Sequence, residues 1–259
     1  MSSNDLMSLE RQGQIVELVN QMGRMTVAQL SERFGVSETT IRRDLVTLAA
    51  RNLIRRTHGG AMRVGSVATS EIPILQRQNQ HAAEKERIGA ATAELIRNGE
   101  TLLIAGGSTG LAVARHLNRH MGLTIITESL LVVQELLRQG QHRLIMLGGT
   151  VDPNEQAVRG TLARQMLAQL CVDKVIIGAR AVSVTRGISA ETPEEAEFLR
   201  AYLECGDHRI LVTDSSKFHL SALATLAPLS AINTLVTDTN LDEDIARQIR
   251  EMDVYLLLV

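Results

Sequence analysis

Thirteen residues, 36–48, carry the polar side chains with the clearest chemical purpose in this sequence. Ile41, Leu45 and Leu48 recur with the spacing of one helix face, so the stretch is predicted to be a helix with one buried side. Off that face lie Thr39, Thr40, Arg42 and Arg43. Arginine donates two hydrogen bonds to O6 and N7 of guanine, and threonine contacts phosphates or the methyl group of thymine. The pattern suits the major groove of DNA, although two arginines on a helix are also typical of an ordinary solvated surface.

The residues before this helix predict the elements that hold it. A helical period of apolar residues runs from residue 15 to residue 22 and indicates a first helix. Thr26 and Gln29 have the spacing of a capping box at the start of a second helix. Gly35 supplies a turn, and Ser37 is the expected N-cap of the helix that follows. Two helices joined by a short glycine turn, the second with a basic face, form a helix-turn-helix.

A short β-hairpin is predicted directly after the helix-turn-helix. Residues 53–57 read as a strand, residues 58–60 as a turn with two glycines, and residues 61–63 as a returning strand. Such a hairpin is a wing that can lie along the phosphate backbone of DNA. Its candidate phosphate contacts are Arg55, Arg56, His58 and Arg63. His58 is equally well explained as a plain turn residue.

Composition and charge fit a binding module joined to a larger body. The chain has 259 residues, 44% of them apolar, and a net charge of −2. Residues 1–63 hold nine arginines and six acidic residues, a net charge of +3, whereas the remainder carries −5. No apolar run has the length of a membrane span, and the first residues do not resemble a signal peptide. The two cysteines, Cys171 and Cys205, are expected to be buried in a reducing compartment, so we expect a cytoplasmic protein.

Residues 64–82 are predicted to be a linker, and residues 83–259 an α/β domain. The linker is rich in small and polar residues and shows no lasting period. After it, short apolar strands alternate with helices, which predicts a parallel sheet covered on both faces. The expected strands are 101–104, 123–126, 143–147, 174–177, 209–212, 233–236 and 254–259. The expected helices are 84–96, 111–117, 130–137, 161–170, 194–204 and 242–252.

A glycine-rich loop follows the first of these strands. It consists of Gly106, Gly107, Ser108, Thr109 and Gly110. Its glycines let the backbone approach a ligand, and free N–H groups at a helix start favour an anion. It has neither the spacing of a Walker loop nor that of a dinucleotide-binding loop. Taken alone, such a loop is more often a tight turn between strand and helix than a phosphate site.

Polar residues at other strand ends are further candidates, because ligands gather at the carboxyl ends of parallel strands. These candidates are Glu128, Ser129, Gly149 and Lys217. Lys217 lies in the run from Asp214 to Phe218, where it can contact a phosphate or a sugar hydroxyl. A cluster that caps a helix beside a surface lysine explains the same run equally well.

The segment from Ser37 to Leu48, together with His58-Gly59-Gly60-Ala61, resembles the DeoR family of bacterial transcriptional regulators. The resemblance implies an N-terminal winged helix-turn-helix followed by a larger α/β domain with a mostly parallel sheet, similar to ribose-phosphate isomerase. It also implies that this domain senses a phosphorylated sugar, with the glycine-rich loop as the phosphate cradle and Lys217 beside it. No cofactor and no metal are expected.

Three positions depart from the family pattern. Ala105 stands where aspartate is usual, Glu128 where asparagine is usual, and Leu199 where lysine is usual. All three are expected near the effector pocket, where Arg180 and Arg186 can restore positive charge. Two like charges 4 Å apart repel by about 4 kcal/mol at an effective dielectric constant near 20. We therefore expect Glu128 to disfavour the usual sugar phosphate and to favour a polyol, an unphosphorylated sugar or a sugar acid.

The sequence thus predicts a regulator, favoured to be a repressor of a carbohydrate-metabolism operon. Its expected partners are double-stranded operator DNA, a small sugar, polyol or sugar-phosphate effector, and further copies of the chain in a homodimer or homotetramer, with no membrane. The alternative is an enzyme, a sugar-phosphate isomerase fused to a DNA-binding domain. Isomerisation needs a positioned general base, which Ala105 lacks and Glu128 can supply.

Overall fold

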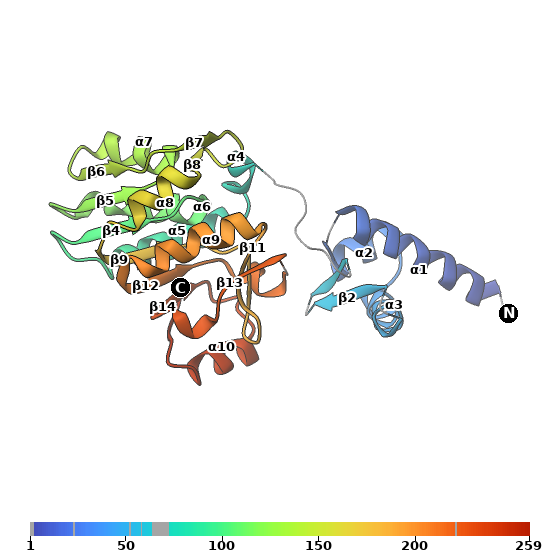
Figure 1. The fold of residues 1–259 in the computed structure, drawn as a ribbon. Helices are drawn as coiled ribbons and strands as arrows, with labels where there is room; N and C mark the ends of the chain where they lie inside the picture. Colours follow the sequence, from blue (N-terminus) through green and yellow to red (C-terminus); the bar gives the residue numbers. More distant parts are fainter. Residues whose placement is uncertain (1–2, 23, 52, 58, 64–72, 221) are drawn as a thin grey trace. The chain divides into compact units, whose positions relative to one another are not determined.

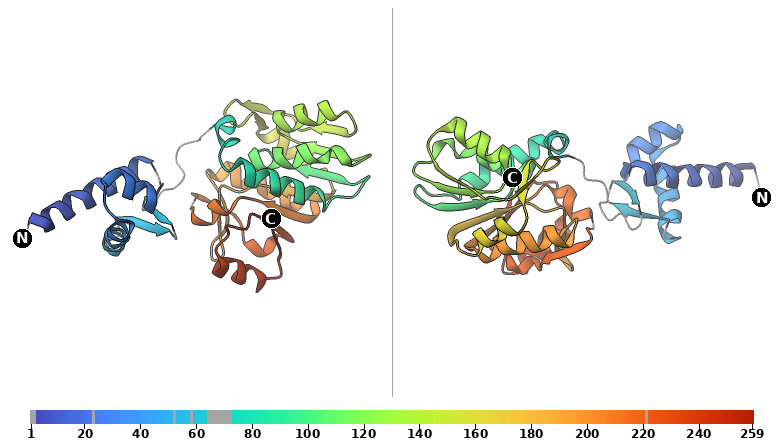
Figure 2. Two further views of the ribbon diagram at one scale, coloured as in Figure 1. Left: turned by 180° about the vertical axis from the view of Figure 1, so that it is seen from behind. Right: turned by 45° about the horizontal axis from the view of Figure 1, so that its top comes forward.

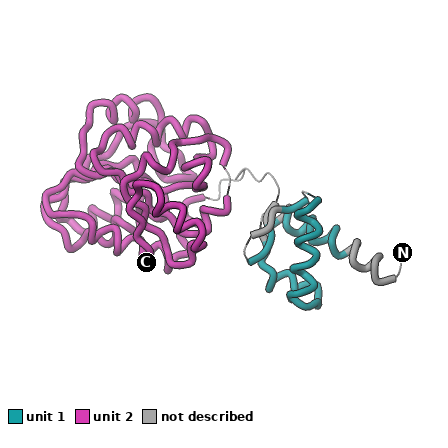
Figure 3. Tube along the Cα trace, turned by 90° about the horizontal axis from the view of Figure 1, so that it is seen from below, with its two compact units in different colours: residues 1–66 teal, residues 67–259 magenta. Residues whose placement is uncertain are grey.

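The computed structural model describes residues 3–22, 24–51, 53–57, 59–63, 73–220 and 222–259. The chain divides into two compact units, residues 1–66 and residues 67–259, which Figure 3 shows in different colours. The first unit encloses one hydrophobic core, and the second has a core on each face of a large sheet. Within the described residues, no helix combines the length and the apolar character needed to cross a membrane.

The first unit packs helices α1 (Ser3–Met22), α2 (Val27–Phe34) and α3 (Glu38–Ala50) against a small antiparallel sheet. The strand order in this sheet is β1 (Arg24–Thr26), β3 (Gly60–Arg63) and β2 (Ile54–Thr57). Strand β1 was not predicted, because three residues are too few to show an alternating pattern. Helix α1 starts well before the apolar period, since no proline or turn cluster interrupts the preceding residues.

Hydrogen bonds at the helix ends fix the turn from α2 to α3. Thr26 Oγ1 accepts a bond of 3.1 Å from the Gln29 N–H, and Gln29 Oε1 accepts one of 2.9 Å from the Thr26 N–H, which confirms the capping box. Gly35 ends α2 with a left-handed φ of 60°, a conformation that favours glycine. Ser37 Oγ accepts a bond of 3.2 Å from the Thr40 N–H and is the predicted N-cap of α3.

A seven-stranded sheet forms the centre of the second unit (Figure 1), and neighbouring strands in it run parallel. In spatial order its strands are β15 (Tyr255–Leu258), β14 (Thr234–Thr237), β12 (Gly206–Val212), β9 (Val172–Ile177), β4 (Thr101–Ile104), β5 (Thr124–Thr127) and β6 (Arg143–Met146). The chain builds outward from β4 to β6 on one side and from β9 to β15 on the other. The strand order therefore reverses between β4 and β9, where an α/β sheet opens a crevice for a ligand.

Helices cover both faces of this sheet, as predicted. One core packs side chains of α5 (Ala82–Ala93), α6 (Ser108–Arg115) and α7 (Leu130–Gln139) against the strands. The other packs α8 (Thr161–Leu167), α9 (Pro193–Glu204) and α10 (Glu243–Arg250) against the opposite face. Figure 1 is seen from the side of α9, and the left view of Figure 2 from the side of α5. Short 3-10 helices span His116–Arg119, Ser215–His219 and Leu229–Ala231.

Two small antiparallel sheets were not predicted. Strands β7 (Thr150–Asp152) and β8 (Ala157–Arg159) form a hairpin. Strands β10 (Ala181–Ser183), β11 (Gly187–Ala190) and β13 (Ala224–Ala227) form a three-stranded sheet. Their strands of three or four residues carry too few side chains for a periodic signal.

The end of the predicted linker belongs to the second unit. Residues 74–77 form a short helix, α4 (Ile74–Arg77), in which Ile74 is only 1% exposed. The Ile74 N–H donates to the carbonyl oxygen of Asn154 at 2.9 Å. Residues 73–82 therefore pack on the α/β body, and Ile74 docks there as the sequence suggested, whereas Leu75 is exposed. Ile72, also expected to dock, lies outside the described residues.

Candidate functional site

The polar face of α3 is exposed, as a DNA-reading surface requires. Thr39, Arg42 and Arg43 are exposed, and Thr40 is half-buried beside Ser37. Arg42 donates to Glu38 Oε2 at 3.0 Å, with both side chains more than half exposed, and Arg43 forms no ion pair within the described residues. Arginines held this loosely keep most of their hydrogen-bond donors for another partner.

Asp44 fixes the orientation of α3, and the sequence analysis did not single it out. It is 4% exposed and accepts bonds from Arg11 Nε at 2.7 Å and from Gln12 Nε2 at 2.9 Å, both in α1. The α3 backbone is thereby tied to α1 by a charged, largely buried contact. The signal was a carboxylate between Ile41 and Leu45, inside the apolar stripe, where an unpaired charge would be costly.

The structure describes the backbone of the two predicted wing strands, β2 and β3, but not all of the predicted contact residues. Arg55 and Arg56 lie in β2, but their side chains are not described, and His58 lies outside the described residues. Their contacts with phosphates stay a prediction.

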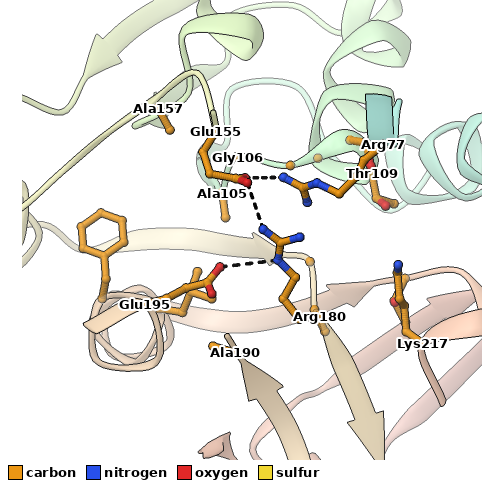
Figure 4. Close-up of a pocket in the computed structure, with 18 of the residues that line it drawn as sticks. Arg77, Ala105, Gly106, Thr109, Glu155, Ala157, Arg180, Ala190, Glu195 and Lys217 are labelled. Atoms are coloured by element: carbon orange, nitrogen blue, oxygen red, sulfur yellow. Dashed lines mark hydrogen bonds and ion pairs between the residues drawn. The ribbon is translucent and has the colours of Figure 1, made fainter. Parts of the chain in front are cut away.

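A pocket in the second unit lies where the strand order reverses. It is bounded by the residues that follow β4, β5, β9 and β12 and by residues from α4, α5, α9 and the β7–β8 hairpin (Figure 4). Its lining includes Arg77, Lys85, Ala105, Gly106, Gly107, Ser108, Thr109, Gly110, Glu128, Glu155, Arg159, Arg180, Glu195, Leu199 and Lys217. The three departures from the family pattern, Ala105, Glu128 and Leu199, all line it.

The glycine-rich loop forms the start of α6 at this pocket. Gly107 has a φ of 117°, a region that side chains rarely adopt. A Cβ on Gly110 would lie 2.3 Å from the carbonyl oxygen of Ala105, so only glycine fits there. Ser108 and Thr109 are buried in the first turn of the helix. Backbone N–H groups and a helix N-terminus face the pocket here, which is the arrangement that binds an anion.

Lys217 lies on the side of the pocket where Thr109 lies (Figure 4). Its ammonium makes no hydrogen bond or ion pair within the described residues. Burial lowers the pKa of Lys217, while the charge of Asp214 raises it and those of Arg180 and Arg77 lower it further. A half-buried ammonium that lines a pocket without a bonded counter-ion is a binding position for an anion.

A largely buried ion cluster around Glu155 forms another part of the pocket lining, and one member, Arg77, lies near Thr109 (Figure 4). Glu155 accepts bonds from the guanidinium groups of Arg77 and, at 2.9 Å, Arg180 (Figure 4). Arg180 also lies 3.6 Å from Glu191 and 3.9 Å from Glu195. Arg180 therefore does not bring a spare positive charge to the site, because three carboxylates surround it. Sequence reasoning missed Arg77, Glu155 and Glu195; the Asp152-Pro153-Asn154 turn was the available signal for the hairpin that carries Glu155.

Glu128 is buried, and both of its carboxyl oxygens accept hydrogen bonds from the protein. The expected repulsion between Glu128 and a phosphate ligand is therefore less well supported. Its Oε1 accepts a bond of 2.7 Å from the Gly106 N–H, and its Oε2 accepts one from the Tyr202 hydroxyl. Burial raises the pKa of Glu128, while these two bonds lower it. Burial and the same carboxyl group raise the pKa of Tyr202. Glu128 thus holds the start of the glycine-rich loop instead of presenting a free carboxylate to a ligand.

Other predicted site residues have structural positions. Ser129 is the N-cap of α7 and accepts a bond of 3.3 Å from the Val132 N–H. Gly149 lies against the backbone of Arg159, and Arg186 is exposed in the β10–β11 turn. None of these three lines the pocket. Cys171 is exposed, contrary to the prediction, and Cys205 is buried as predicted. Among the described residues, no group of three His, Cys, Asp or Glu side chains is placed to hold a metal ion.

Two protein-family profiles match the sequence. Residues 11–67 match the DeoR-like helix-turn-helix domain, and residues 80–239 match the DeoR C terminal sensor domain. The transcriptional repressor AccR of Agrobacterium fabrum is 37% identical over 231 residues, which cover 89% of this chain and 89% of that protein. The chain belongs to the DeoR family.

A second repressor is also similar to this DeoR-family chain. The glycerol-3-phosphate regulon repressor of Escherichia coli is 35% identical, over 88% of this chain and 90% of that protein. Among solved structures, ribose 5-phosphate isomerase A of Methanocaldococcus jannaschii aligns with a TM-score of 0.40 and 14% identity, over 53% of this chain and 55% of that chain. The family and the fold class predicted from the sequence are confirmed. The DeoR-family chain is a transcriptional regulator with a DNA-binding helix-turn-helix and a sensor domain.

Proposed function

We propose that this chain represses an operon of carbohydrate metabolism and that a small sugar-like anion, such as a sugar phosphate, binds in the pocket and alters its grip on DNA. In this proposal residues 1–63 bind the operator, residues 64–72 join the two units, and residues 73–259, which include the pocket residue Arg77, sense the effector. The observation that carries it is the half-buried ammonium of Lys217, which lines the pocket with the glycine-rich loop and has no bonded counter-ion in the described residues. Two relatives named as repressors, one of a glycerol-3-phosphate regulon, support the same assignment.

The distribution of charge supports an anion at one end of the ligand. Carboxylates already surround Arg180, whereas the start of α6 from Gly107 to Gly110 and Lys217 offer donors. Ser108 and Thr109 add hydroxyl groups at the same end. Phosphate binds well at such a helix start. The carboxylates of Glu155 and Glu195 accept hydrogen bonds, so hydroxyl groups of a sugar or polyol suit the other end.

The DNA side of the proposal assigns base contacts to Thr39, Thr40, Arg42 and Arg43. Arg55, Arg56 and His58 contact phosphates. One small winged module covers little DNA, and specific sites are usually bound by two related modules. We therefore propose a homodimer or homotetramer. Sedimentation of the whole protein at micromolar concentration tests this assembly, and a monomer with and without DNA contradicts it.

A ligand screen tests the effector site. Thermal shift of the full chain is measured with sn-glycerol 3-phosphate, ribose 5-phosphate and glucose 6-phosphate, and with the same compounds lacking phosphate. We expect a phosphate-dependent stabilisation that Lys217→Met removes and that the exposed control Arg186→Gln keeps. Equal shifts with unphosphorylated compounds, or an unchanged Lys217→Met, contradict the anion site. DNA selected from a random pool then supplies the operator for measuring release by the compound that binds.

The isomerase alternative depends on Glu128 as the general base. Both carboxyl oxygens of Glu128 are engaged, one by the Gly106 N–H and one by the Tyr202 hydroxyl. A base held in this way is poorly placed to take a proton from a substrate. The regulator is therefore the better supported function. A coupled assay with pentose and hexose phosphates tests the point, and turnover that Glu128→Gln abolishes would favour the enzyme.

A further inference from the structure

Helix α4 is the first described element after the residues that connect the two units. Strand β3 of the first unit ends at Arg63, and residues 64–73 separate it from the start of α4. Ile74 anchors the helix in the second unit, with its side chain 1% exposed. Along the chain, α4 is therefore the described element of the second unit that comes directly after the connection to the DNA-binding unit.

Two charged groups of the pocket hold α4 in place. Glu155 binds the guanidinium of Arg77, the last residue of α4 (Figure 4). Lys85 donates from its ammonium to the carbonyl oxygens of Arg77 at 2.7 Å and of Gln80 at 2.6 Å. Arg77, Lys85 and Glu155 all line the effector pocket. The groups that fix α4 are thus the groups that a ligand in the pocket meets.

These contacts are shielded from water, so a ligand competes with them directly. The side chains of Arg77 and Glu155 are 14% and 7% exposed, and that of Arg180 is 13% exposed. A guanidinium pairs in a planar, bidentate manner with either a carboxylate or a phosphate. In a poorly hydrated site, a phosphate that approaches Arg77 takes donors that Glu155 now holds. It also attracts the ammonium of Lys85 away from the two carbonyl oxygens.

We propose that Glu155 and Lys85 are positioning residues through which an anion in the pocket changes how α4 is held, and thereby signals to the DNA-binding unit. This inference rests on the proposed function. A ligand shifts an equilibrium only by binding one state more tightly than another. Here the ligand gains the Arg77 guanidinium only when it has left Glu155, and the Lys85 ammonium only when it has left the carbonyl oxygens of Arg77 and Gln80. It therefore binds the loosened state more tightly.

If phosphate binding loosens α4, then loosening α4 must strengthen phosphate binding by the same factor. The variant Glu155→Gln tests this reciprocity. The variant keeps the size of the side chain and removes the charge that competes for Arg77. It should loosen α4 without ligand and should bind phosphate more tightly than the wild type. Loss of the Glu155 charge also favours an anion by electrostatics alone. The response of exchange in residues 73–82 to phosphate therefore distinguishes coupling through α4 from a simple effect of charge.

The experiment uses the full chain with inorganic phosphate as the probe and sodium chloride at matched ionic strength as the reference. Amide hydrogen exchange is followed in peptides covering residues 73–82. In the wild type we expect phosphate to speed exchange there about tenfold. Glu155→Gln should show this faster exchange without phosphate, and its phosphate dissociation constant should fall about three- to tenfold. Glu94→Gln, an exposed acidic residue of the same unit, is the matched control and should behave as the wild type.

The outcomes separate the inference from the function on which it rests. If phosphate binds and changes operator affinity while exchange in residues 73–82 stays constant, the inference is wrong and the proposed effector site stands. Equal phosphate affinity in Glu155→Gln and wild type also overturns it. If phosphate binds neither protein, the anion site is wrong. In that case the ligand-free comparison decides the coupling: unchanged exchange and unchanged operator affinity in Glu155→Gln reject it.

Discussion

The two candidate binding surfaces of this protein treat arginine in opposite ways. In α3, the side chain of Arg42 is 58% exposed and pairs with an equally open Glu38, and Arg43 is exposed. In the pocket, Arg77 and Arg180 are 14% and 13% exposed, and carboxylates hold both. An exposed guanidinium is solvated by water, so it needs no protein partner and keeps its donors free for phosphates or bases. A buried one must be neutralised beforehand, because an unpaired charge there costs several kcal/mol.

This difference determines whether binding at each surface displaces water or displaces protein groups. Under the proposed function, DNA replaces water around the exposed arginines of α3. Under the same proposal, a ligand in the pocket replaces protein groups that already have partners, so its binding is an exchange of partners that rearranges the protein. A recognition surface therefore gains from rigid, open side chains, whereas a sensor gains from buried pairs that a ligand can separate.

The largest expected effect concerns Asp44, a buried and paired charge that lies in the first unit and not in the pocket. Asp44→Ala removes the acceptor shared by Arg11 and Gln12 and should lower the local free energy of unfolding by about 3 kcal/mol. Hydrogen exchange in peptides from α3 measures this loss. Glu32→Ala, at an exposed position of α2, is the control with little expected effect. A change below about 1 kcal/mol would show that Asp44 is not needed to hold α3.

The second prediction tests the open surface itself. Arg43→Ala should weaken binding to a selected operator by about 1–3 kcal/mol, with relaxed preference at one base pair, because a bidentate contact to guanine is lost. Fluorescence anisotropy with operator and scrambled duplexes at fixed salt makes the measurement. Arg250→Ala, exposed in the second unit, is the control. An equal loss on both duplexes would reassign Arg43 to a phosphate.

The third prediction uses the pocket's titratable ammonium. Burial lowers the pKa of Lys85 from 10.5 to about 8. Its charged fraction therefore falls from about nine-tenths at pH 7 to about one-tenth at pH 9. If the ligand gains the Lys85 ammonium, the dissociation constant of a phosphate monoester should rise about tenfold over this range, where the ester stays a dianion. Calorimetry at pH 7, 8 and 9 measures the profile, and Lys85→Met should flatten it. An equal slope in the variant would assign the titration to another group, such as Lys217.

The sequence predicted correctly those elements whose signal lies in residues close to one another in the chain. The capping box at Thr26, the N-cap at Ser37 and the apolar stripe of α3 depend on neighbours within four residues, and all three are present. The seven strands of the large sheet were found because buried parallel strands are continuous apolar runs.

No local sequence pattern predicts the ion cluster of the pocket. Arg77 and Glu155 are 78 residues apart and meet only because α4 packs against the β7–β8 hairpin. Both elements are shorter than the window in which a period shows. The role of Glu128 also depended on a distant partner, since Tyr202 reaches it from α9. Long-range pairs of this kind decide which side chains a ligand meets, and a single sequence does not reveal them.

The smallest expected effect concerns the exposed pair of α3. Glu38→Gln removes the partner of Arg42, whose side chain is 58% exposed, and an exposed pair at this helical spacing contributes less than about 0.5 kcal/mol to stability. The unfolding free energy should therefore change very little. Operator affinity should rise about twofold, because a carboxylate beside the DNA backbone is lost and Arg42 gains freedom to bind phosphate or base. The gain should shrink as salt is raised. Anisotropy titrations at two salt concentrations resolve it, and weaker binding by Glu38→Gln would mean that Glu38 positions Arg42 for its contact.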